Sequence, residues 1–62
     1  MTPASFHAWR VRLYGERGQK AAADALGCSR TAFRQWEAGT NKIPLYIALA
    51  CAALAQGLPP IG

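Results

Sequence analysis

Charged side chains are absent from the last third of the sequence, and acidic ones are few throughout. Residues 43–62 contain no Lys, Arg, Asp or Glu, and the whole chain has 3 acidic against 7 basic residues, a net charge of +4. A basic balance in so short a chain favours a polyanionic partner. Because every charge lies between Arg10 and Lys42, the sequence divides into a basic, polar part and an uncharged C-terminal part.

Histidine and cysteine are also scarce. The chain has 1 His and 2 Cys, so Cys and His alone cannot supply the four ligands of a structural zinc site. Cys28 and Cys51 have no metal-binding spacing, and we expect both thiols to stay reduced. No Ser-His-Asp set, acid–base carboxylate pair or phosphate-binding glycine motif is visible. We therefore expect a protein that is not an enzyme and that has no cofactor and no small-molecule ligand. We expect the side chain of His7 to be exposed to solvent.

The sequence has no apolar run long enough for a membrane helix. Residues 43–58 are uncharged, but they include Pro44, Gln56 and Gly57 and fall short of the about 20 apolar residues that a span needs. The N-terminal residues do not show a basic run followed by an apolar one, so no signal peptide is expected. These features predict no membrane contact and a cytoplasmic, nucleoid-associated location.

The pattern of apolar residues predicts a single all-α domain, residues 1–62, with four helices. Thr2 and Pro3 can start a first helix that ends near Tyr14, and further helices are expected over 19–26, 30–38 and 45–56. Gly57 and the prolines after it end the last one. We expect these inward positions in the first three helices: Phe6, Trp9, Leu13, Ala22, Ala23, Leu26, Phe33 and Trp36.

The second and third predicted helices are joined by a three-residue turn. Gly27 suits a corner that needs a positive φ, and Ser29 can cap the helix that follows. The outward side of this third helix carries side chains at i, i+1, i+4 and i+5 that can donate to base edges or touch a thymine methyl in a DNA major groove. They are Arg30, Thr31, Arg34 and Gln35.

This stretch resembles the helix-turn-helix of Cro and phage-repressor-type regulators, the xenobiotic-response-element class. The residues that carry the resemblance are Gln19, Ala23, Gly27, Cys28, Phe33 and Trp36-Glu37-Ala38-Gly39, and the match continues through Ile43-Pro44. It implies a lambda-repressor-like fold and a sequence-specific regulator of transcription that binds double-stranded DNA. The chain is also similar, more weakly, to small phage and mobile-element regulators, including anti-CRISPR-associated ones.

Two further expectations come with the resemblance. A basic residue seven positions before the Gln often pairs with the Glu after the Trp, which here would be Arg12 and Glu37. Ser or Thr often precedes the Gln, and Gly18 stands there instead, so the second helix lacks a side-chain cap. The alternative for Arg12 and Glu37 is two independent surface charges.

Polar residues at helix starts and in the loop after the third helix predict contacts to DNA phosphates. Helix N-termini favour anions, and the family uses the loop in the same way. The predicted phosphate-binding residues are Gln19, Lys20, Ser29, Asn41 and Lys42.

The last predicted helix is apolar nearly all round. We expect one stripe, Leu45, Ala48, Leu49 and Ala52, to close the core, and a second, Tyr46, Ile47, Ala50 and Leu54, to form a homodimer interface. Residues 44–62 would then be the dimerisation element of a repressor that occludes a promoter at an inverted-repeat operator. The alternative is an antitoxin-like or adaptor module whose last helix binds a different protein.

Overall fold

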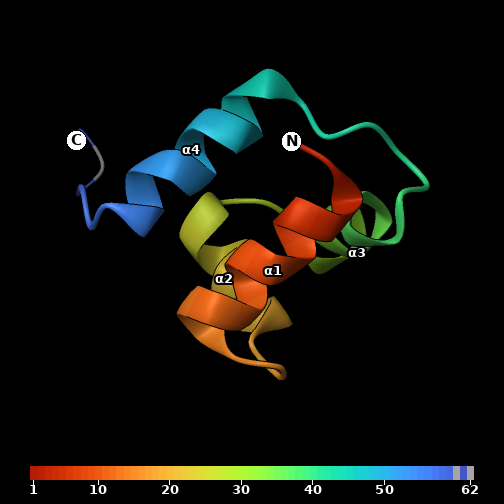
Figure 1. Cartoon of the computed structure of the whole chain (residues 1–62), viewed down its shortest axis with the longest axis horizontal. Helices are drawn as coiled ribbons and strands as arrows, with labels where there is room; N and C mark the ends of the chain where they lie inside the picture. The colour runs from red at the N-terminus through yellow and green to blue at the C-terminus, as the bar shows by residue number, and fades with distance from the viewer. Residues whose placement is uncertain (60, 62) are drawn as a thin grey trace.

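The computed structural model describes residues 1–59 and 61 and has four α-helices. They are α1 (Pro3–Tyr14), α2 (Gln19–Leu26), α3 (Arg30–Ala38) and α4 (Leu45–Ala55). No strand occurs in the described residues, which confirms the all-α, four-helix prediction. α4 lies across one side of the group formed by the other three helices, after a long connection from α3 (Figure 1). No helix in the described part of the chain has the length and apolar character to cross a membrane.

The helix ends follow from local side-chain chemistry. Thr2 Oγ1 accepts from the Ser5 backbone N–H at 3.1 Å, and Ser5 Oγ accepts from the Thr2 N–H at 2.9 Å, a reciprocal capping box. Ser29 Oγ accepts from the Ala32 N–H at 3.1 Å and caps α3, as predicted. Gly27 ends α2 with φ 71°, a conformation that glycine adopts without steric cost.

Gly18 is required by the packing between α1 and α2. It starts α2 without a side-chain cap, as predicted from the sequence. A Cβ on Gly18 would lie 2.3 Å from the carbonyl oxygen of Tyr14, at the end of α1. No side chain fits at this contact, which explains why the capping Ser or Thr is missing.

The core is built around aromatic rings from α1 and α3. The Phe6 ring centroid lies 4.7 Å from that of Phe33 and 6.3 Å from that of Trp36. The inward positions predicted for α1, α2 and α3 are confirmed: Phe6, Trp9, Ala22, Ala23, Phe33 and Trp36 are buried, and Leu13 and Leu26 pack against them. Cys28 also packs against this core but is only partly buried.

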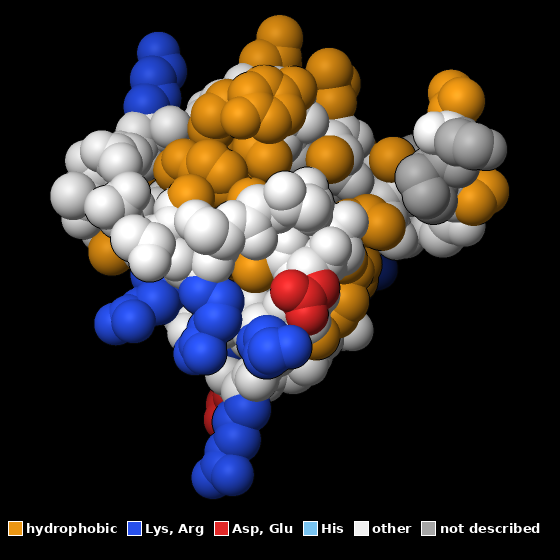
Figure 2. All heavy atoms as spheres, turned by 180° about the vertical axis from the view of Figure 1, so that it is seen from behind, with side chains coloured by type: hydrophobic (Ala, Val, Ile, Leu, Met, Phe, Trp, Pro, Cys, Tyr) orange, Lys and Arg blue, Asp and Glu red, His pale blue; other side chains and the backbone are white. Residues whose placement is uncertain are grey.

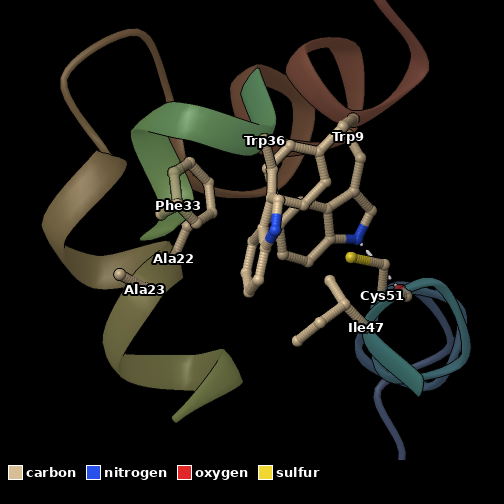
Figure 3. Close-up of a cluster of buried hydrophobic side chains, with 8 residues drawn as sticks. Trp9, Ala22, Ala23, Phe33, Trp36, Ile47 and Cys51 are labelled. Carbon is tan, nitrogen blue, oxygen red and sulfur yellow. Dashed lines mark hydrogen bonds between the residues drawn. The ribbon is translucent and has the colours of Figure 1, made fainter. Parts of the chain in front are cut away.

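α4 closes the core with the opposite face from the predicted one. Ile47 and Cys51 point into the core (Figure 3), where they are 2% and 1% exposed, while Leu45 and Leu49 are 75% and 62% exposed. The Trp9 indole N–H donates to the Cys51 carbonyl at 2.9 Å and fixes α4 on α1. The prediction was wrong because both stripes are apolar, and periodicity alone does not decide between them.

Candidate nucleic-acid interface

Arg10 ties α1 to α3 from a buried position. The residue is 4% exposed, and its Nε donates to Glu37 Oε2 at 2.7 Å. Its Nη1 donates to the carbonyls of Gly15 and Glu16 at 2.9 and 2.6 Å. One guanidinium therefore holds the end of α1, the connection into α2 and the C-terminal half of α3 together.

The expected partner of Glu37 was Arg12, and that prediction is wrong. Arg12 is exposed, whereas Arg10 follows the buried Phe6 by four residues and shares its side of α1. Two residues further along a helix turn a side chain by about 200°, from the 3.6-residue repeat, away from that side. Arg12 was predicted by counting seven residues back from Gln19. That count crosses the connection at 15–18, which is not helical, so it does not show which side of α1 a residue occupies.

Glu37 has two further polar neighbours besides Arg10. Gln19 Nε2 donates to Glu37 Oε1 at 2.7 Å, and His7 Nδ1 lies 3.5 Å from Oε2. Partial burial alone would raise the pKa of Glu37, but the hydrogen bonds from Arg10 and Gln19, with the charge of Arg10, outweigh it, so the pKa lies below its ordinary value. His7 is more than half exposed, as expected, although it lies beside this pair.

These contacts fix the orientation of α3 relative to α1 and α2. Phe33 and Trp36 bury one side of α3, and Glu37 fastens its last turn. Gln19 was predicted to contact a phosphate, but its side-chain NH₂ group donates to Glu37 inside the protein instead. The motif spacing includes both Gln19 and Glu37, but it did not indicate that they bond to each other.

The predicted base-reading residues lie on the outer side of α3. Arg30, Thr31 and Arg34 are exposed, and Gln35 is half-buried. Thr31, Arg34 and Gln35 line one shallow hollow, which Ala38 and Thr40 complete. The structure thus brings three of the four residues together around a single surface feature, with Arg30 at the start of the same helix.

The loop after α3 folds back onto Gln35. Asn41 Nδ2 donates to Gln35 Oε1 at 2.7 Å. The backbone N–H groups of Thr40 and Asn41 donate to the Gln35 carbonyl at 2.9 and 3.3 Å. Asn41 was predicted to contact a phosphate, but its side chain bonds to a predicted base-reading residue, a partnership that the sequence did not indicate.

The remaining predicted phosphate contacts, Lys20, Ser29 and Lys42, are exposed. Lys20 Nζ lies 3.3 Å from Asp24 Oδ2, but both side chains are largely solvated, so this pair holds Lys20 only weakly. Several Lys and Arg side chains gather on one part of the surface, and an apolar patch occupies another (Figure 2). On the face shown in Figure 2, most of the basic side chains therefore lie apart from the apolar patch.

The apolar patch includes an exposed side of α4. Leu45, Tyr46 and Leu49 are 75%, 68% and 62% exposed, and we call these three residues the α4 face. Of the predicted dimer residues, only Tyr46 belongs to it. Ile47 lies in the core, and Ala50 and Leu54 are half-buried beside a hollow between α2 and α4, so these three residues do not form the exposed apolar surface that was predicted.

Burial raises the pKa of both cysteine thiols. Burial, with the neighbouring Cys28 thiol, raises the pKa of Cys51 to about 11, so this thiol is protonated at neutral pH. Within residues 1–59 and 61, no group of three or more His, Cys, Asp or Glu side chains is placed to hold a metal ion.

Comparison with known proteins adds no relative: no protein-family model, no curated protein and no solved structure matches the chain.

Proposed function

We propose that the protein is a sequence-specific DNA-binding regulator of transcription, of the helix-turn-helix type that its sequence resembles. The observation that carries the proposal is the two-sided character of α3. One side is locked by Phe33, Trp36 and Glu37, and the other presents exposed Arg and Thr side chains. A rigid helix with exposed, directional donors fits the major groove of DNA.

The exposed residues match the chemistry of base edges. Arg30 and Arg34 can each make two hydrogen bonds to guanine N7 and O6, and the Thr31 methyl can touch the methyl of thymine. Lys20, Ser29 and Lys42, with free N–H groups at the helix starts, would contact the phosphates. Phosphate contacts fix the position of the protein on DNA, and contacts to base edges select the sequence.

Dimerisation through the α4 face would supply the discrimination that one copy lacks. About three base contacts at about 1–3 kcal/mol each give about 3–9 kcal/mol, often too little against the roughly 10⁶ or more competing genomic sites. Two copies related by a two-fold axis double this value and bind an inverted repeat. A dimer of this kind, acting in the cytoplasm on the nucleoid, would repress by occluding a promoter.

A second candidate follows from the same exposed residues. Leu45, Tyr46 and Leu49 could instead bind a different protein, as in an antitoxin-like or adaptor module. A chain that sediments as a monomer at all concentrations would favour this alternative.

The proposal is tested by selecting bound sequences from random duplex DNA. We expect wild type to enrich one motif, and Arg30→Ala to relax the preference at a single base position at a cost of about 1–3 kcal/mol. Arg12→Ala is the matched control, because it removes the same charge from an exposed site on α1. Binding without any enriched motif, or equal effects of the two variants on the motif, would contradict the proposal.

A further inference from the structure

We propose that Asn41 is a positioning residue that determines which base edge Gln35 reads, rather than a phosphate contact. The inference rests on the proposed DNA binding and specifies how one of its base contacts is made. Asn41 turns the Gln35 amide so that its NH₂ group, and not its carbonyl oxygen, is presented to DNA. The base opposite Gln35 is then one with acceptors in the major groove, foremost guanine.

The direction of the hydrogen bond sets the orientation of the amide. Asn41 contributes its NH₂ group, which can only donate, so the partner atom on Gln35 must be the carbonyl oxygen, 2.7 Å away. The Gln35 NH₂ group, on the other branch of the same planar amide, is left with its two donors. A freely rotating glutamine would present either end equally well.

The backbone holds Asn41 where this bond forms. Gly39 ends α3 with φ 80°, a left-handed conformation that reverses the chain. The N–H groups of Thr40 and Asn41 then both donate to the Gln35 main-chain carbonyl. Main-chain and side-chain bonds therefore join the same two residues. The main-chain bonds already hold the two residues close together, so the Asn41–Gln35 side-chain bond costs only side-chain rotamer freedom and no further ordering of the backbone.

The oriented amide lies at the proposed reading surface. Gln35 shares its hollow with Thr31 and Arg34, which are exposed. Guanine offers two acceptors, N7 and O6, to a donor group, whereas the adenine pattern needs one donor and one acceptor from the amide. The adenine pattern needs the same oxygen that accepts from Asn41, which would have to use its second lone pair beside the Asn41 side chain. The Gln35 NH₂ group meets no such competition, so guanine is the better match.

The experiment is a selection from random duplex DNA with wild type, Asn41→Ala, Asn41→Asp, Gln35→Ala and the double variant Gln35→Ala/Asn41→Ala. A carboxylate at position 41 only accepts, so it would attract the Gln35 NH₂ group and turn the carbonyl outward. We expect guanine to be preferred about fivefold or more at one position in wild type. Asn41→Ala should flatten that preference, and Asn41→Asp should shift it toward adenine or cytosine, whose edges carry donors.

Coupling between the two residues decides between positioning and a phosphate contact. In the Gln35→Ala background, Asn41→Ala should change neither base preference nor affinity, because its only route of action has been removed. Lys42→Ala is the neighbouring control and should weaken all sequences about equally, with a smaller salt dependence. For Asn41→Asp, the ratios of affinity between bases are compared rather than the affinities themselves, because the added negative charge weakens binding to any DNA.

Two results would overturn the inference. If Asn41→Ala weakens binding to all sequences equally, and does so equally without Gln35, then Asn41 is a phosphate contact and the proposed function stands. If wild type enriches no motif, then the proposed function and this inference fail together. Thermal unfolding of each variant, followed by circular dichroism, verifies that the exposed loop substitution leaves the fold intact.

Discussion

Glu37 joins three helices through one carboxylate, and its hydrogen bonds explain how a buried guanidinium is tolerated. Arg10 and Gln19 donate to its two oxygens from α1 and α2. Removing a charge from water is costly, and a close partner with good geometry offsets that cost. The pair therefore fixes the relative positions of the helices, and breaking it should be more harmful than breaking an exposed ion pair.

Glu37→Ala should strongly destabilise the fold, because it leaves the Arg10 guanidinium buried without its carboxylate. Loss of one partner of a buried pair costs about 3–5 kcal/mol. A 62-residue domain has roughly 3–9 kcal/mol in total, so much of the variant should be unfolded at 25 °C. Urea unfolding measures the effect. Arg12→Ala, the control, should stay within about 0.5 kcal/mol of wild type, and equal losses for both variants would contradict the assignment of Arg10.

The same carboxylate predicts an acid-sensitive fold. The pKa of Glu37 is lowered in the folded protein, whereas in the unfolded chain it is about 4.3. Its contribution is therefore complete above about pH 4.3 and is lost as the pH falls through the lower, folded-state pKa. Melting temperatures between pH 7 and pH 2 should fall more steeply for wild type than for Glu37→Gln, which does not titrate. Parallel curves would show that other groups cause the acid response.

At the scale of the helices, the α1–α2 connection depends on the absence of a side chain. Gly18→Ala and Gly18→Ser should each destabilise the domain by about 1–3 kcal/mol, since the added Cβ would meet the Tyr14 carbonyl at 2.3 Å. Helix propensity and N-capping alone predict a gain of stability from Ser at this position. Unfolding measurements on both variants, with the exposed Glu16→Ala as control, distinguish these expectations. A more stable Gly18→Ser would mean that the backbone moves to accept it.

The extent of each helix and the inward faces of α1, α2 and α3 could be predicted from the sequence. α2 and α3 each have an apolar side and a polar side, and in α1 the large apolar residues Phe6 and Trp9 recur at helical spacing. The caps Thr2 and Ser29 are local interactions. The last helix has no polar side to mark the solvent, so its orientation depends on which residues fill the space beside the aromatic core of α1 and α3. Ile47 and Cys51 occupy that space, which only the assembled core defines.

The polar contacts of the candidate interface were harder to predict. Glu37–Gln19 and Gln35–Asn41 are bonds between side chains whose distance depends on how helices and loops meet. Helical spacing placed Gln35 on the outer side of α3, where it is half-buried, but nothing in the sequence connected it with Asn41 in the following loop. Sequence spacing shows on which side of a helix a residue lies, but only within that helix. It does not relate residues on opposite sides of a non-helical connection such as 15–18.

At the scale of the whole molecule, the proposed function assigns the apolar and the basic surface to two different partners. An apolar patch includes the α4 face, and many of the basic side chains gather elsewhere (Figure 2). A standard interface buries about 800 Å² on each partner, roughly a fifth of the 4356 Å² surface. Leu45, Tyr46 and Leu49 would form its centre, so a second copy could be joined there while the exposed side of α3 remains open to DNA.

Leu49→Glu should convert the proposed dimer into a folded monomer. Leu49 is 62% exposed, so the charge does not disturb the core, and it would face its own copy across a two-fold axis. Sedimentation over a range of concentrations measures the change, and Ala21→Glu, which adds the same charge on exposed α2, should leave the dimer intact. Ile47→Glu does not serve this purpose, because Ile47 is 2% exposed and its substitution would unfold the chain.

The geometry of a two-fold dimer then predicts the spacing of the operator. Two α3 helices that enter successive major grooves on one face of DNA lie about 34 Å apart, one helical turn between half-site centres. Inserting about five base pairs between half-sites would turn them to opposite faces of the duplex, so affinity should fall to that of a single half-site. Inserting about ten base pairs restores the face but not the distance, and a dimer joined rigidly through α4 should still bind poorly. Wild type that binds a single half-site as tightly as the full repeat would show that each copy acts alone, and the α4 face would then belong to a different protein partner.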